Sequence, residues 1–89
     1  MSQPRFPLGQ IVATAGAASK LSPIQIIGLL SRHAAGDWGE VPPEDAQENE
    51  LSVKEGFRIL SAYKVDGTAY WLITEADRSC TTILLPDEY

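Results

Sequence analysis

The C-terminal third of the chain has the residue pattern of antiparallel strands. The stretches FRILSAYKV and TAYWLITE are rich in β-branched and aromatic residues, and an Asp-Gly pair at positions 66–67 joins them. This pair favours a type I′ turn with a two-residue hairpin loop. Because such a turn fixes the register, we expect Tyr63 to lie opposite Tyr70 and Arg58 to lie opposite Glu75.

A third strand is expected to extend this hairpin. A second turn around residues 76–79 leads into the run CTTILL, and Pro86 then ends the strand. If the second loop holds two or four residues, Leu72 lies opposite Ile83. The three strands would then form an antiparallel meander.

The N-terminal half carries signals for one strand and for helices. Residues 8–13 indicate a short strand, and Thr14 suits the N-cap of a short helix over residues 15–21. Ser22 followed by proline marks the start of a longer helix, which ends near Gly36. One broad side of this longer helix is apolar and is predicted to face the core, and it holds Ile24, Ile27, Leu30, Ala34 and Ala35.

A third helix is predicted over Pro43–Glu55, and Gly56 follows its end. Its apolar stripe is thin, so we expect it to be peripheral. The predicted order is one short strand, two to three helices and three strands, which is an α+β fold with one sheet. The first strand is expected to join one edge of that sheet. Residues 1–7 are expected to form a flexible arm, and residues 8–89 a single α+β domain.

The composition is that of an ordinary small globular domain, with 89 residues, 44% hydrophobic and 21% charged. No apolar run approaches the roughly 18 residues of a membrane span, and the N-terminus lacks the layout of a signal peptide. The single cysteine, Cys80, and the single histidine, His33, argue against a disulfide and against a His/Cys zinc site. We therefore expect a cytoplasmic protein with no cofactor, no metal and no membrane association.

Charge is distributed unevenly along the chain. Twelve acidic residues outnumber seven basic ones, and the net charge is −5. Residues 1–36 contain no acid, whereas a dense acidic stretch follows and holds Asp37, Glu40, Glu44, Asp45, Glu48, Glu50 and Glu55. Because phosphate contacts need clustered Lys and Arg, we expect no direct binding to nucleic acid.

Two interpretations of the acidic stretch are open. It is either a solvated helix face that keeps the protein soluble, or a surface that meets a basic protein. Under the second interpretation the partner is another protein with a basic surface. The candidate partner-binding residues are Asp37, Trp38, Glu40, Glu44, Asp45 and Glu48, together with Glu75, Asp77 and Arg78 from a polar turn.

The predicted register leaves both faces of the sheet apolar. Helices can cover one face, and the other needs a second cover because large exposed apolar patches are rare on monomers. That cover is either an intermolecular contact, such as a homodimer, or the chain's own arm and third helix. The candidate interface residues are Tyr63, Tyr70, Trp71, Leu72 and Leu85.

Candidate chemistry is sparse. His33 is placed at the edge of the longer helix with Asp37 four residues on, where it is either a general base or a residue that favours the helix C-terminus. The polar turn at residues 75–78 either binds an ion or a phosphate, or satisfies its own hydrogen bonds. Trp38, in a loop next to glycine, is either a binding hot spot or a plug over the end of the core.

The segments HAAGDWGEVPPED, GFRILSAY and ITEADRSCTTILLPDEY resemble a family of short uncharacterised proteins carried by bacterial plasmids, integrative elements and related mobile DNA. The resemblance covers nearly the whole chain beyond residue 6, and ITEADRSCTTILLP is its most specific part. It implies a mobile-element setting, in which proteins often act against host defence. It brings no established activity, cofactor or catalytic residue.

Three functions are open at this point. The first is a non-enzymatic interaction protein that inhibits a CRISPR or restriction component by binding it. The second is a small hydrolase or nuclease that uses His33 and the turn at residues 75–78. The third is an accessory or regulatory protein of the mobile element.

Overall fold

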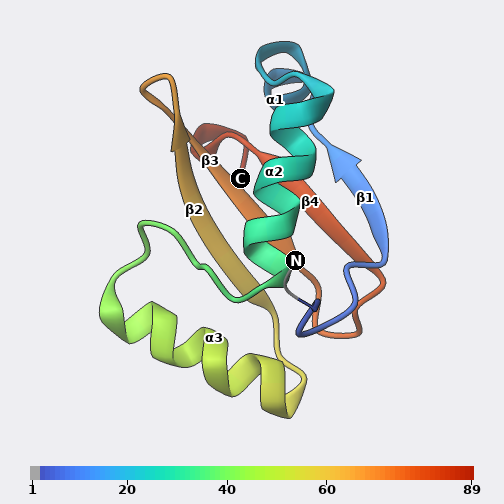
Figure 1. The fold of residues 1–89 in the computed structure, drawn as a ribbon, viewed down its shortest axis with the longest axis vertical. Coiled ribbons are helices and arrows are strands. Elements are labelled where there is room, and N and C mark those ends of the chain that lie inside the picture. The colour runs from blue at the N-terminus through green and yellow to red at the C-terminus, as the bar shows by residue number, and fades with distance from the viewer. Residues whose placement is uncertain (1–2) are drawn as a thin grey trace.

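Four strands form one mixed sheet in the computed structural model, which describes residues 3–89 (Figure 1). The strand order is β1-β4-β3-β2, and the strands are β1 (Gln10–Ala13), β2 (Ile59–Val65), β3 (Thr68–Thr74) and β4 (Cys80–Leu84). The α+β class is confirmed, and the first strand joins one edge. That strand runs parallel to β4, so the sheet is mixed, whereas the other neighbours are antiparallel.

The hairpin between β2 and β3 has the predicted turn and register. Asp66 and Gly67 both have positive φ, 51° and 79°, as a type I′ turn requires. Tyr63 pairs with Tyr70. The second loop holds four residues, because the Glu75 amide donates to the carbonyl of Cys80, and Leu72 therefore lies opposite Ile83 as predicted.

Three α-helices and a short 3₁₀ turn complete the fold, and they are α1 (Ala15–Lys20), α2 (Pro23–Ala34), α3 (Pro43–Glu55) and η1 (Pro86–Glu88). Helix α2 begins at a capping box. The Ser22 hydroxyl accepts from the Gln25 amide, and the Gln25 side chain accepts from the Ser22 amide. Figure 1 shows α2 lying across one face of the sheet, with α3 at the lower end beside β2.

The predicted core-facing side of α2 was correct at Ala34, which is buried, and at Leu30, which packs against the core, but it was wrong at Ile24 and Ile27. Leu29 and His33 are buried, whereas Ile24 and Ile27 are 82% and 62% exposed. The apolar arc of this helix is wider than the strip that touches the sheet, and the helix is rotated so that one end of that arc faces outward. This rotation leaves large apolar side chains at the surface.

Helix α2 covers the face of the sheet that contains Tyr63, Tyr70 and Leu72, and all three are at most 2% exposed. They were candidate interface residues, and this burial within the chain corrects that prediction, since their side chains do not reach the surface. Leu85 packs against the same cluster and is half-buried.

The opposite face of the sheet is covered in part by the C-terminal residues. The ring of Tyr89 meets Trp71 edge-on, with 5.6 Å between ring centroids. Ile73 and Leu84 on this face are 4% and 5% exposed. Trp71, a candidate interface residue, remains half-buried. The contacts within the described residues thus place η1 and Tyr89 over this face. The sequence had suggested two other covers, an intermolecular contact or the chain's own arm and third helix.

A second apolar cluster joins the lower end of the sheet to the N-terminal segment. Phe6, Trp38 and Ile59 form its centre, and each is at most 7% exposed. The amide of Arg5 donates to the carbonyl of Ala34 at 2.8 Å. The described part of the segment expected as a flexible arm thus packs onto the domain, while residues 1–2 lie outside the described range.

Candidate functional site

Helix α3 presents an acidic face to solvent. Its first turn holds Glu44 and Asp45 directly after Pro43, at the end of the helix where the dipole favours carboxylates. Glu48 follows one turn later, and all three acids are exposed. None of them takes part in the ion pairs found within residues 3–89. No ion pair within these residues therefore neutralises their charge.

The inner side of α3 is fixed to the sheet by Asn49. Its side-chain amide donates to the carbonyl of Leu60 at 2.7 Å, and its oxygen accepts from the Leu60 amide at 3.2 Å. Asn49 is only 5% exposed. The pair of bonds occupies backbone groups at the outer edge of β2 and holds the acidic helix in one position.

Trp38 closes the end of the core beneath α3. Its indole N–H donates to Glu50 at 3.0 Å, and two guanidinium nitrogens of Arg5 donate to the same carboxylate at 3.0 and 2.7 Å. These donors lower the pKa of Glu50, with the Arg5 bonds as the main cause. At 7% exposed, Trp38 has the position of a plug rather than of a surface hot spot.

Asp37 is engaged within the chain. Its carboxylate accepts from Arg32 at 2.7 Å and from the Gly39 amide at 3.2 Å, and both contacts hold its pKa below the ordinary value, the Arg32 bond most of all. Arg32 also lies 4.5 Å from the ring centre of Tyr63. The general-base alternative for His33 needed Asp37 as its partner, and Asp37 instead forms an ion pair with Arg32. Glu40 remains exposed.

The polar turn at residues 75–78 satisfies its own hydrogen bonds. Arg78 donates to the carbonyls of Ser52 and Phe57 at 2.8 and 2.7 Å and thereby caps the C-terminal end of α3. Asp77 accepts from the Ser79 amide at 2.9 Å. This is the structural alternative of the two predicted for the turn. The hydrogen bonds of the Arg78 side chain there all go to backbone carbonyls.

Glu75, the remaining candidate in this turn, pairs with Arg58 at 3.4 Å, as the hairpin register predicted. The fold thus brings the polar turn to one end of α3 and leaves the three exposed carboxylates toward the other end. A polar hollow of about 200 Å³ lies between α3 and β2, and it is lined by Asp45, Glu48, Asn49, Ser52, Arg58 and Leu60.

His33 is fully buried, which corrects its expected place at the edge of the helix. Its Nε2 atom lies 2.8 Å from the hydroxyl of Thr74, whose oxygen lies 2.7 Å from the hydroxyl of Thr81. Thr81 in turn donates to the carbonyl of Leu8 at 2.8 Å. The Nδ1 atom is hydrogen-bonded to the hydroxyl of Ser61.

This chain of bonds assigns the protons of the histidine. Because the Thr81 hydroxyl donates to a carbonyl, it accepts from Thr74, which must then accept from Nε2–H of His33. The Nδ1 atom is left to accept from Ser61. The ring is neutral in this arrangement, and burial lowers the pKa of His33 to about 4.

The polar partners of His33 were missed at the level of the sequence. Ser61, Thr74 and Thr81 lie 28, 41 and 48 positions away from His33 along the chain. One signal was present: all three occupy inward-facing positions in strands whose other inward positions are large and apolar. A buried hydroxyl needs a hydrogen-bond partner, and the single histidine on the covering helix was the available one.

Within residues 3–89, no three His, Cys, Asp or Glu side chains lie together in a group able to hold a metal ion. None of the described helices has the length and apolar character needed to cross a bilayer. Searches against protein-family models, curated proteins and solved structures found no match to this chain.

Proposed function

We propose that this chain is a small non-enzymatic binding protein whose acidic helix α3 docks on a basic surface of another protein. The observation that carries the proposal is that Glu44, Asp45 and Glu48 are exposed on α3 and form no ion pair within the described residues. A surface of one charge sign steers and orients an oppositely charged partner.

The support beneath α3 favours recognition over a purely solubilising role. Asn49 fixes the middle of the helix to β2, and Arg78 caps its C-terminal end. A helix held at both places presents its carboxylates in a fixed arrangement, which lowers the entropy lost on binding. Leu51 is 52% exposed on the same helix and adds an apolar contact beside the acids.

The partner that we propose is a component of host defence that handles nucleic acid. The resemblance to short proteins of plasmids and integrative elements gives this setting, and proteins that bind nucleic acid carry clustered Lys and Arg. An acidic helix that covers such a cluster would compete with the phosphate backbone. Inhibition by occupation of that surface is the mechanism we propose.

Affinity capture from a bacterial host tests this function. The bait proteins are the wild-type chain, the Glu44→Gln/Glu48→Gln variant, and a Gln3→Lys/Ala18→Lys control that raises the net charge equally on the acid-free part of the chain. All four positions are exposed, so each bait should fold. We expect a nucleic-acid-handling protein with a basic surface to bind the wild type and the control and to be lost from the variant.

Equal recovery of every captured protein by the variant and the wild type would show that the acidic face is only a solvated surface. Recovery of proteins encoded by the mobile element, in place of a defence component, would support the accessory role instead.

A further inference from the structure

The two edges of the sheet are treated differently by the fold. At the β2 edge, Ala62 donates to the carbonyl of Trp38 at 3.1 Å and accepts from the Glu40 amide at 2.7 Å, and Asn49 occupies the backbone of Leu60. That edge is therefore occupied at Leu60 and Ala62. At the other edge, no described segment pairs with the outer side of β1, and all four of its residues are exposed.

The hydrogen-bond pattern shows which groups of β1 point outward. The Gln10 amide bonds to the carbonyl of Ser79, and the Thr14 amide bonds to the carbonyl of Ile83. Backbone direction alternates along a strand, so the N–H and C=O groups of Ile11 and Ala13 point away from β4. The sequence of β1 is QIVA, without charge or proline. Open edges of monomeric sheets usually carry such blocking residues.

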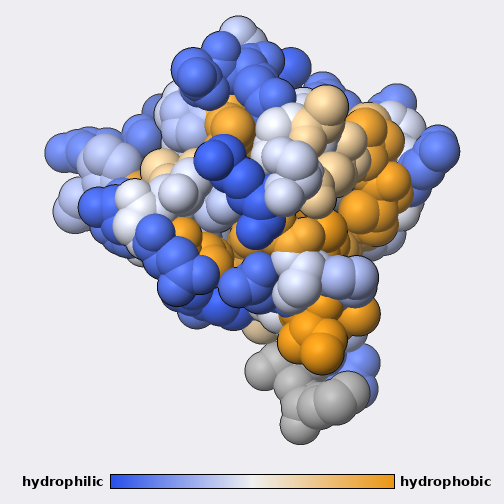
Figure 2. All heavy atoms as spheres, turned by 90° about the horizontal axis from the view of Figure 1, so that it is seen from above, coloured by the Kyte–Doolittle hydropathy of each residue, from blue (hydrophilic) through white to orange (hydrophobic). Residues whose placement is uncertain are grey.

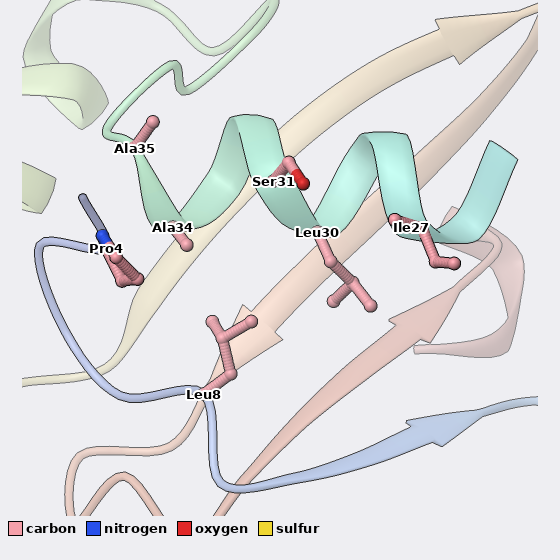
Figure 3. A pocket seen from close by; sticks show the side chains of 7 residues that line it. All are labelled: Pro4, Leu8, Ile27, Leu30, Ser31, Ala34 and Ala35. Atoms are coloured by element: carbon pink, nitrogen blue, oxygen red, sulfur yellow. The ribbon is translucent and has the colours of Figure 1, made fainter. Parts of the chain in front are cut away.

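An apolar surface lies beside this open edge. Pairing with Thr81 puts Ile11 on the face of the sheet that α2 covers. A groove of about 350 Å³ separates α2 from the N-terminal segment, and Leu8, Ile27 and Leu30 reach into it (Figure 3). Figure 2 shows hydrophobic side chains gathered on the right of the view, the side on which Figure 1 places β1.

We propose that β1 pairs in antiparallel fashion with β1 of a second copy of this chain, which joins the two sheets into one of eight strands. The two-fold axis of such a pair stands perpendicular to the sheet, so the α2 helices of both copies lie on the same face. Ile11 and Ile27 of each copy then adjoin those of the other across the axis. The backbone groups of Ile11 and Ala13 gain partners in the same step.

A second copy fits this surface better than a single peptide strand does. A peptide would satisfy the edge but leave Ile27 and Ile24 of α2 exposed, whereas a second copy brings a strand and an apolar helix in one matching arrangement. Charge also favours it. Residues 1–36, which include β1 and α2, contain no acid, and the acidic helix α3 lies beyond the opposite edge of the sheet. Although each chain is acidic overall, neither β1 nor α2 brings a negative side chain to the contact.

Sedimentation velocity of the full chain, from low micromolar to several hundred micromolar, measures the association. We expect a reversible monomer–dimer equilibrium. Hydrogen exchange at the two ends of this range then locates the contact. The Ile11 and Ala13 amides should be protected only at high concentration, whereas the Gln10 amide, bonded to Ser79 within the chain, should be protected at both.

Substitutions separate this surface from the rest of the molecule. Ile11→Lys and Ile27→Glu should each raise the dimer dissociation constant by roughly tenfold or more, because each places a charge at the contact. The control Leu51→Lys changes an apolar residue of α3 whose exposed fraction, 52%, lies between the 41% of Ile11 and the 62% of Ile27, and it should leave the dissociation constant unchanged. Thermal melting followed by circular dichroism checks that each variant folds. A monomer at the highest concentration, or a dimer whose Ile11 and Ala13 amides exchange freely, overturns the proposal.

Discussion

The Nε2 atom of His33 on α2 lies 2.8 Å from the hydroxyl of Thr74 on β3. This contact joins the helix that covers the sheet to the middle of the sheet itself. Thr81 continues the chain of bonds into β4, and Ser61 continues it into β2. The arrangement fixes the rotation of α2 on three strands at once, and it operates only while the imidazole is neutral.

The stability of the fold should therefore depend on pH through His33. Its pKa is about 4 in the folded chain and about 6.5 when unfolded. The unfolded chain binds a proton that the folded chain does not, so stability is complete above pH ~6.5 and falls as the pH drops toward ~4. The full loss is on the order of 3 kcal/mol. Urea unfolding between pH ~7 and ~5, above the range of most carboxylates, measures the slope.

Because His33 is the single histidine of the chain, its protonation can be followed directly by NMR. Its ring protons give one set of NMR signals, which should not titrate in the folded protein until the pH is well below 6. A ring that titrates near its ordinary pKa of ~6.5 would contradict the buried network. The His33→Gln variant, if folded, should lose the stability slope between pH ~6.5 and ~5.

Asn49 should contribute to stability through the β2 edge. Asn49→Ala removes both hydrogen bonds to the backbone of Leu60 and leaves those groups without a protein partner. We expect a loss of about 2 kcal/mol in the free energy of unfolding. The matched control is Gln47→Ala, an exposed position on the same helix, which should change stability by less than ~0.5 kcal/mol. Equal effects of the two substitutions in urea unfolding would contradict the role given to Asn49.

Alanine substitutions at Gly39 and Gly56 test how closely the loop around Gly39 approaches the backbone of β2. Both have positive φ, 74° and 84°, so alanine is strained at either position. A Cβ at Gly56 meets nothing within 4 Å, whereas one at Gly39 would fall on the carbonyl oxygen of Ala62. Gly56→Ala should cost about 1 kcal/mol, and Gly39→Ala at least ~2 kcal/mol more. Similar melting temperatures for the two variants would refute the close pairing of the loop with β2.

Local sequence signals predicted the β2–β3 hairpin. The parts of the fold that depend on contacts between residues far apart in the sequence could not be predicted in this way. The Asp-Gly pair at positions 66–67 sets the β2–β3 register within a few residues, so the sequence was sufficient there. The parallel pairing of β1 with β4 joins Ile11 to Thr81, seventy positions apart, and no local pattern specifies it. Because this long-range pairing could not be predicted from the sequence, neither could the open outer edge of β1.

The errors in α2 and in the candidate site have a common physical reason. A helical wheel shows the width of the apolar arc but not which part of it meets the sheet, and the polar anchor His33 turned out to fix that choice. The candidate interface residues Tyr63 and Tyr70 were placed correctly on one face of the sheet. Their burial followed from the covering helix, whose orientation the sequence did not specify.

The acidic face of α3 is tested most directly by the affinity of a captured basic partner across a range of salt concentrations. Titration calorimetry would compare the wild type with the Glu44→Gln/Glu48→Gln variant and the Gln3→Lys/Ala18→Lys control. Both variants change the net charge equally, so they differ only in where the charge changes. We predict roughly tenfold weaker binding and a shallower salt dependence for the α3 variant alone. Equal affinity and salt dependence of all three proteins would contradict the proposed function.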